Sequence, residues 1–187
     1  WLEAPDSFPI SQSLPLRTEP FRQKECRGFF GGILPEQGNR SVIARILKIS
    51  ERNDFAMLER IGGECAGALT FVPEGEPPPR GDDDYRPLAD DELAEILRKL
   101  PKRPLLAGEH GVRLSLAGAQ DKIAVRVDRD GRLSLPLNNA PSTHILKPAS
   151  VTWEGIVPNE IFCMALAAAV GLPAAPTTAH RIAAIEY

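Results

Sequence analysis

The residues of this chain that could do chemistry lie in its second half. A loop over residues 115–122 reads SLAGAQDK, and its small side chains at 117–119 leave the backbone amides accessible, as a phosphate cradle requires. Lys147 follows Gly118 by 29 residues, and Glu160 follows Lys147 by 13. The ammonium of Lys147 could hold phosphate groups as a point charge, and the carboxylate of Glu160 could orient that ammonium.

Each of these residues also has an ordinary structural explanation. A loop with one glycine is usually structural, because nucleotide fingerprints carry several glycines at fixed offsets. Ser115 alone is a loop serine, and Glu160 alone is a favourable charge near the start of a helix. The loop and Glu160, taken together with a lysine at the end of a strand, favour phosphate binding.

The segments around these residues predict a small antiparallel sheet followed by a helix. We expect strands over 122–128, 133–137 and 144–147, an Asp130-Gly131 turn between the first two, and a helix from Asn159 or Glu160 to Val170 that Gly171 ends. This order is the layout of a protein-kinase N-lobe. There, a loop covers the ATP phosphates and a lysine on a strand contacts them.

The first half of the chain predicts helices. Apolar residues recur at helical spacing after Glu36 and again from Leu93 to Leu100, where we expect Asp90 to cap the helix and Pro101 to end it. Asn53 should cap a short helix with Phe55, Leu58 and Ile61 on one face and Gly62 as a left-handed stop, followed by a strand over 68–72. Four prolines keep residues 1–20 extended.

A proline-rich and acidic segment, PEGEPPPRGDDDYRP, occupies residues 73–87 and is expected to be a solvated connector without packed elements. Metal binding by the aspartates at 82–84 is a weaker alternative, because they lack the spacing of a calcium loop. We expect one domain over 1–104, which contains this connector, and the start of a second over 105–187.

Composition excludes several classes of protein. The chain has 187 residues and a net charge of -3, which gives no broad cationic field for nucleic acid. Its three cysteines and three histidines have neither disulfide nor metal-ligand spacing, so we expect no metal site in the chain. We expect no membrane span and no secretory signal, which leaves the cytoplasm as the default compartment.

Six segments together resemble the HipA family of bacterial serine/threonine kinase toxins, in family order and across nearly the whole chain. They are SLPLRTEPF, FFGGILPEQGNR, IGGECAGALTFVPEG, RLSLAGAQDKIAV, STHILKP and NEIFCMALAAAVGLP. The resemblance implies an α+β fold: a HipA N-terminal subdomain with its start missing, then the antiparallel-sheet N-lobe of a kinase-like fold that stops before the C-lobe.

The resemblance also implies roles for particular residues. The nucleotide-binding set would be Leu116, Ala117, Gly118, Ala119, Gln120, Asp121, Lys122, Lys147 and Glu160, with ATP as substrate and Mg²⁺ as its metal. Ser115 would be the autophosphorylation position. Family toxins belong to type II toxin–antitoxin systems, phosphorylate aminoacyl-tRNA synthetases and induce growth arrest or persistence. A HipB-like DNA-binding antitoxin would be the partner, with DNA association through it.

The chain also departs from the family. No HRD-like or DFG-like segment follows Ala183, so the catalytic base and the magnesium ligands are expected in a C-lobe that this sequence lacks. We therefore expect the chain to be catalytically silent alone and the full-length protein to be a kinase. The alternative is a natural short protein, a non-catalytic module that docks on a kinase or antitoxin and regulates it.

Overall fold

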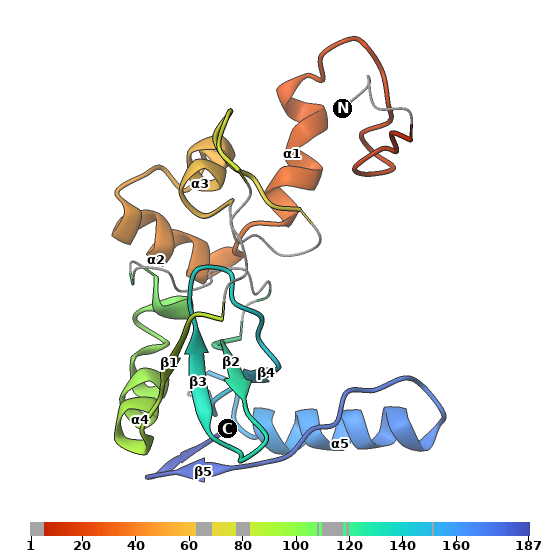
Figure 1. Ribbon diagram of the computed structural model, residues 1–187. Coiled ribbons are helices and arrows are strands. Elements are labelled where there is room, and N and C mark those ends of the chain that lie inside the picture. Colours follow the sequence, from red (N-terminus) through yellow and green to blue (C-terminus); the bar gives the residue numbers. More distant parts are fainter. Residues whose placement is uncertain are drawn as a thin grey trace.

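The computed structural model describes residues 6–62, 69–77, 83–107, 109, 118, 120–150 and 152–187 (Figure 1). Its helices are α1 (Gln23–Gly32), α2 (Gln37–Leu47), α3 (Asp54–Ile61), α4 (Asp90–Lys99), the 3-10 turn η2 (Pro104–Leu106) and α5 (Ile156–Ala169). Its strands are β1 (Tyr85–Pro87), β2 (Ile123–Val127), β3 (Leu133–Pro136), β4 (His144–Leu146), β5 (Arg181–Ile182) and β6 (Ile185–Glu186).

The central sheet is antiparallel throughout, with the order β1-β3-β2-β4. The β2–β3 hairpin forms at the predicted Asp130-Gly131 turn, where one carboxylate oxygen of Asp128 accepts the backbone N–H groups of Asp130 and Arg132. Gly131 has a φ of +78°, a conformation that favours glycine. The expected α+β fold with an antiparallel sheet is confirmed.

One hydrophobic core joins α4 to this sheet. The predicted apolar face of α4 is buried: Leu93, Ile96, Leu97 and Leu100 pack with Leu106 and with Ile123, Val125 and Leu135 of the strands. The helix starts one residue earlier than expected, because Ala89 takes the cap position and Asp90 is the first helical residue. The pair β5–β6, which sequence patterns did not predict, covers the same core through Ile182 and Ile185.

A second core holds the helical first half together. Leu34, Ile43, Ala44, Met57 and Ile61 form it, together with Ala107. As predicted, Asn53 caps α3 by accepting the N–H of Ala56. The predicted face of α3 is wrong at Phe55, which is 77% exposed, whereas Met57 is fully buried. Gly62 is not a left-handed stop, since its φ is -66°.

Three further expectations differ from the structure. Residues 69–72 form no strand, and residue 68 lies outside the described residues. Residues 83–87 are not all solvated connector, because β1 pairs with β3. Since β1 and α4 share a sheet and a core with β2 and β3, the expected boundary between residues 104 and 105 crosses one packed unit.

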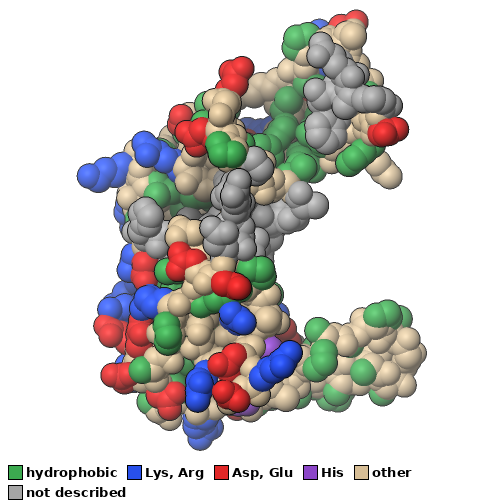
Figure 2. Space-filling model, in the orientation of Figure 1, with side chains coloured by type: hydrophobic (Ala, Val, Ile, Leu, Met, Phe, Trp, Pro, Cys, Tyr) green, Lys and Arg blue, Asp and Glu red, His purple; other side chains and the backbone are tan. Residues whose placement is uncertain are grey.

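Helix α5 extends away from the sheet, with much of its surface exposed (Figures 1 and 2). It begins at Ile156, three residues before the expected start, because Pro158 fits the first turn of a helix, where no N–H is needed. Glu160 is its only charged residue, and only Val157 is buried. Phe162, Leu166 and Val170 are 50–65% exposed and recur every four residues on one face.

Candidate nucleotide-phosphate site

Lys147 and Glu160 form an ion pair. Lys147 directly follows β4, and Glu160 lies in the second turn of α5, so the pair links the sheet to the helix. The Nζ atom of Lys147 donates to Oε1 of Glu160, and both side chains are about one-third exposed. The lysine is thereby held in place while part of its ammonium still faces solvent, as a group that contacts phosphate requires.

A second lysine lies beside the first. Strand β2 pairs with β4 so that Ile123 faces Leu146, and the same register places Lys122 opposite Lys147. Lys122 is only 9% exposed. Burial lowers the pKa of Lys122, and the positive charge of Lys147 lowers it further, while three carboxylates partly oppose the shift. Two ammonium groups therefore lie next to each other at one end of the β2–β4 pair.

At Gly118, the predicted loop lies close to the ammonium group of Lys122. The φ of Gly118 is +100°, which only glycine adopts readily. A Cβ atom added to Gly118 would lie 2.9 Å from Nζ of Lys122, so any side chain there would displace the ammonium. Glycine thus permits a close approach between the loop backbone and Lys122.

The neighbouring loop residues are partly buried. Burial raises the pKa of the Asp121 carboxyl, although Lys122 opposes this shift. The side-chain nitrogen Nε2 of Gln120 is buried, and within the described part of the chain it has no hydrogen-bond partner. An amide donor left unpaired in a site with two ammonium groups suits an anionic ligand, because a phosphate oxygen could accept from it.

Four predicted site residues, Ser115, Leu116, Ala117 and Ala119, lie outside the described residues. The other six lie at one end of the sheet: Gly118, Gln120, Asp121, Lys122, Lys147 and Glu160. Their role in nucleotide binding stays a prediction.

Glu36 was missed by sequence reasoning. This residue occupies the N-cap position of α2, in the first half of the chain, yet its charge raises the pKa of Lys122 and so acts on the site. No local motif could have found it, since 86 residues separate it from Lys122. As for metals, the described ranges contain no group of three His, Cys, Asp or Glu residues that could hold an ion.

The donor set fits the phosphates of ATP. It contains two ammonium groups, an unpaired amide nitrogen and a glycine turn, and the carboxylate of Glu160 pairs with Lys147, while Glu36 and Asp121 also act on Lys122. A polyphosphate would relieve the repulsion between the two lysines. Because Mg²⁺ prefers several carboxylate or carbonyl oxygens, this donor set suits the phosphates of a magnesium nucleotide and leaves the metal to other ligands.

This arrangement predicts how Lys122 titrates. Replacing Lys147 by methionine removes a positive charge that lowers the pKa of Lys122 and frees Glu160, which raises it. We therefore expect the pKa of Lys122 to move upward, towards that of an ordinary lysine, in the Lys147→Met variant. NMR titration of the lysine side-chain resonances measures this, with Lys99→Met as the control. An unchanged pKa of Lys122 in Lys147→Met would show that the two ammonium groups are not neighbours.

Comparison with known proteins identifies the family. A family model described as HipA N-terminal domain matches residues 1–72, and one described as HipA-like C-terminal domain matches residues 114–187. The chain belongs to the HipA family. The resemblance of its six segments is thereby confirmed.

Relatives of this HipA-family chain are named as kinases. It is 50% identical over 94% of its length to a Sinorhizobium fredii protein named "Putative kinase Y4mE", and covers 43% of that protein. It is 29% identical over 88% of its length to the Shewanella oneidensis serine/threonine-protein kinase toxin HipA, of which it covers 37%. The chain thus spans about two-fifths of these relatives.

A solved structure shares the fold. A chain in the Shewanella oneidensis complex of HipA, HipB and operator DNA superposes with a TM-score of 0.72 and 27% identity. The match covers 96% of this chain and 41% of the other. The α+β architecture is therefore that of a HipA-family protein. Among the described residues, no helix combines the length and the hydropathy that a bilayer span requires.

Proposed function

We propose that this chain supplies the ATP-phosphate contacts of a HipA-type serine/threonine protein kinase toxin. The observation that carries the proposal is the Lys147–Glu160 ion pair beside Lys122 and Gly118, in a chain whose relatives are named as kinases. In a protein kinase, a strand lysine contacts the phosphates and a glutamate of the next helix holds it. Lys147 and Glu160 take these two roles.

Each residue of the site contributes a distinct contact. The ammonium of Lys147 binds the α- and β-phosphates, and the loop over 116–122 covers them through its backbone amides. Lys122 and the side-chain amide of Gln120 supply further donors. Phosphoryl transfer consists mostly of positioning and charge stabilisation, so these contacts orient ATP. A C-terminal lobe supplies the base that activates the substrate hydroxyl. The same lobe supplies the magnesium ligands.

Helix α5 supports the presence of such a lobe. A helix that is apolar on all sides is typical of a protein interior, yet Phe162, Leu166 and Val170 are exposed here. The relatives are more than twice as long as the matched region. We propose that the C-terminal lobe of the full-length protein packs against this face of α5.

The proposed biological role is that of a HipA-type toxin. The substrate is a translation-related protein such as an aminoacyl-tRNA synthetase, and the partner is a HipB-like antitoxin that associates the complex with DNA. The matched complex of HipA, HipB and operator DNA supports this partner. A phosphate on Ser115 would add a charge of about -1.5 to -2, which repels ATP and shuts the kinase down.

The direct test is phosphoryl transfer by the full-length protein. Incubated with radiolabelled ATP and Mg²⁺, the protein should transfer label to itself or to a protein from the translation machinery, and its intact mass should rise by one phosphate. If neither label nor mass changes and ATP does not bind, the chain is not part of a kinase and the docking-module alternative takes its place.

A further inference from the structure

Lys122 has the features of a nucleophilic lysine. The residue is only 9% exposed, so its ammonium is largely removed from water. Burial lowers the pKa of Lys122 and the charge of Lys147 lowers it further, whereas the carboxylates of Glu160, Glu36 and Asp121 oppose the shift. The neutral amine is the form of a lysine that attacks carbonyl groups. This form is therefore more abundant at Lys122 than at an ordinary surface lysine.

The register of the sheet places a phosphate anchor beside this amine. Strand β2 pairs with β4, and their register, continued by one residue, sets Lys122 opposite Lys147. Residues directly opposite each other on antiparallel strands have Cβ atoms about 4.5–5.5 Å apart. The ammonium of Lys147 is held by Glu160, and its side chain is one-third exposed. A phosphate on Lys147 is therefore a neighbour of the Lys122 amine.

Gly118 leaves space next to the amine. A Cβ atom added to Gly118 would lie 2.9 Å from Nζ of Lys122, so this nitrogen faces the volume that a side chain at position 118 would fill. Two positions before Lys122, the buried Nε2 of Gln120 has no hydrogen-bond partner among the described residues. A small ligand with a phosphate and a carbonyl group would find here a cation, a nucleophile and an amide donor.

We propose that Lys122 is an acylation site for small acyl phosphates such as acetyl phosphate, whose phosphate group binds Lys147 while the carbonyl carbon meets the Lys122 amine. The amine nitrogen attacks that carbon, a C–N bond forms and the C–O bond to the phosphate breaks. The electron pair of the broken bond stays with the phosphate, which also takes the proton from the nitrogen and leaves as inorganic phosphate. The product is an uncharged amide.

Acylation at this position silences the nucleotide site. The amide gives the ATP phosphates one positive charge fewer, and the acyl group fills the space beside Gly118. We expect the acetylated protein to bind ATP at least about tenfold more weakly, the effect of losing one charge-assisted contact. This consequence rests on the proposed kinase function, whereas the modification itself does not. Equal affinities of acetylated and unmodified protein, measured by calorimetry, would overturn the silencing effect.

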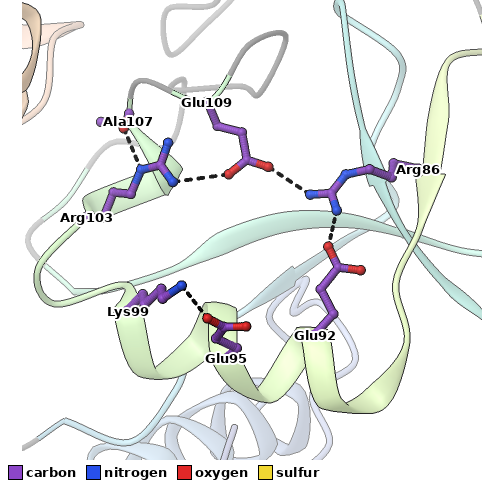
Figure 3. A network of polar contacts seen from close by, with 7 residues as sticks. All are labelled: Arg86, Glu92, Glu95, Lys99, Arg103, Ala107 and Glu109. Atoms are coloured by element: carbon purple, nitrogen blue, oxygen red, sulfur yellow. Dashed lines mark hydrogen bonds and ion pairs between the residues drawn. The ribbon is translucent and has the colours of Figure 1, made fainter.

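The test incubates the full-length protein with acetyl phosphate and follows acetylation of each lysine by peptide mass spectrometry. The initial rate at Lys122 should saturate with acetyl phosphate and be at least about tenfold higher than at Lys99, because one charged contact holds the donor. Inorganic phosphate should suppress it. Lys99 is the internal control: it also pairs with a glutamate, Glu95, but lies more than half exposed on α4 (Figure 3). Inorganic phosphate should not protect Lys99.

A second donor separates the anchor from the reactivity of the amine. The ester p-nitrophenyl acetate transfers the same acetyl group but carries no phosphate. Lys147→Met should lower the rate at Lys122 about tenfold more with acetyl phosphate than with the ester, because only the first donor uses the ammonium of Lys147. Lys147→Arg keeps the charge and should retain most of the rate. Competition by inorganic phosphate tests the same anchor in the wild type, if Lys147→Met folds poorly.

The outcomes distinguish this inference from the proposed function. If Lys122 reacts no faster than Lys99, or if inorganic phosphate gives it no protection, the inference fails. If the protein binds ATP and Lys122 stays unmodified, the inference fails while the proposed function stands. If Lys122 is acetylated but the unmodified protein does not bind ATP, the acylation site stands and the proposed kinase function fails.

Discussion

The Lys147→Ala variant of the full-length protein should lose at least about 100-fold in the rate of ATP-dependent phosphorylation, a magnitude typical of removing one preorganised charge contact. Two effects combine in this variant. The phosphates lose the ammonium that contacts them, and the carboxylate of Glu160 loses its partner in the ion pair. An unpaired negative charge then faces the triphosphate, which repels it.

The matched control for this variant is Lys99→Ala. Lys99 also pairs with a glutamate, Glu95, but the pair is exposed on α4, and neither residue is among the charges that shift the pKa of Lys122. Initial rates of phosphate incorporation should be the same for Lys99→Ala and the wild type. Retention of more than about half of the wild-type rate by Lys147→Ala would refute the role assigned to Lys147.

The largest loss of stability is expected for Leu100→Ala. Leu100 is fully buried where α4 ends, in the core that joins this helix to the sheet. Truncating a buried leucine removes apolar contacts and leaves a cavity, which costs about 2–5 kcal/mol. Urea unfolding of the chain, followed by circular dichroism, measures the loss of unfolding free energy.

Leu166→Ala is the comparison for this measurement. Leu166 is half exposed on α5, and alanine has the highest helix propensity, so the change should stay within about 0.5 kcal/mol. Equal effects of the two variants would mean that α4 does not pack on the sheet as described. The packing of β1 with α4 in one unit would then also be wrong.

Local patterns were sufficient to predict the central hairpin and the relation between Lys147 and Glu160. Alternating apolar residues and the Asp130-Gly131 turn specify β2 and β3 without long-range information. The strand before Lys147 and the helix that carries Glu160 follow from equally local signals. The layout of a kinase N-lobe, in which the following helix carries the acid that orients the lysine, then predicted that the two residues meet.

Features that depend on distant pairing could not be predicted in this way. Strand β1 has three residues and ends in a proline, so it exists only because β3 offers it an edge. Helix α1 buries no residue and contains three glycines, which hides its periodicity. The contribution of Glu36 to the site depends on how α2 packs near the sheet.

The sequence analysis named Lys122 and Lys147 but did not predict that they lie opposite each other. Lys122 begins one predicted strand and Lys147 ends another, and an antiparallel register sets them opposite each other. The sequence alone does not give the register, because it fixes the ends of short strands only to within a residue or two. The structure supplies that register and places the two predicted lysines next to each other.

The central claim is that Lys147 and Lys122 face the phosphates of one bound ATP. The most direct measurement treats the full-length protein with an acyl-phosphate derivative of ATP, which acylates lysines beside the phosphates, and maps the modified peptides by mass spectrometry. We predict modification of Lys147, Lys122 or both, suppressed by excess ATP, with Lys99 and Lys102 unaffected by the competition. ATP-sensitive labelling confined to other lysines would contradict the claim.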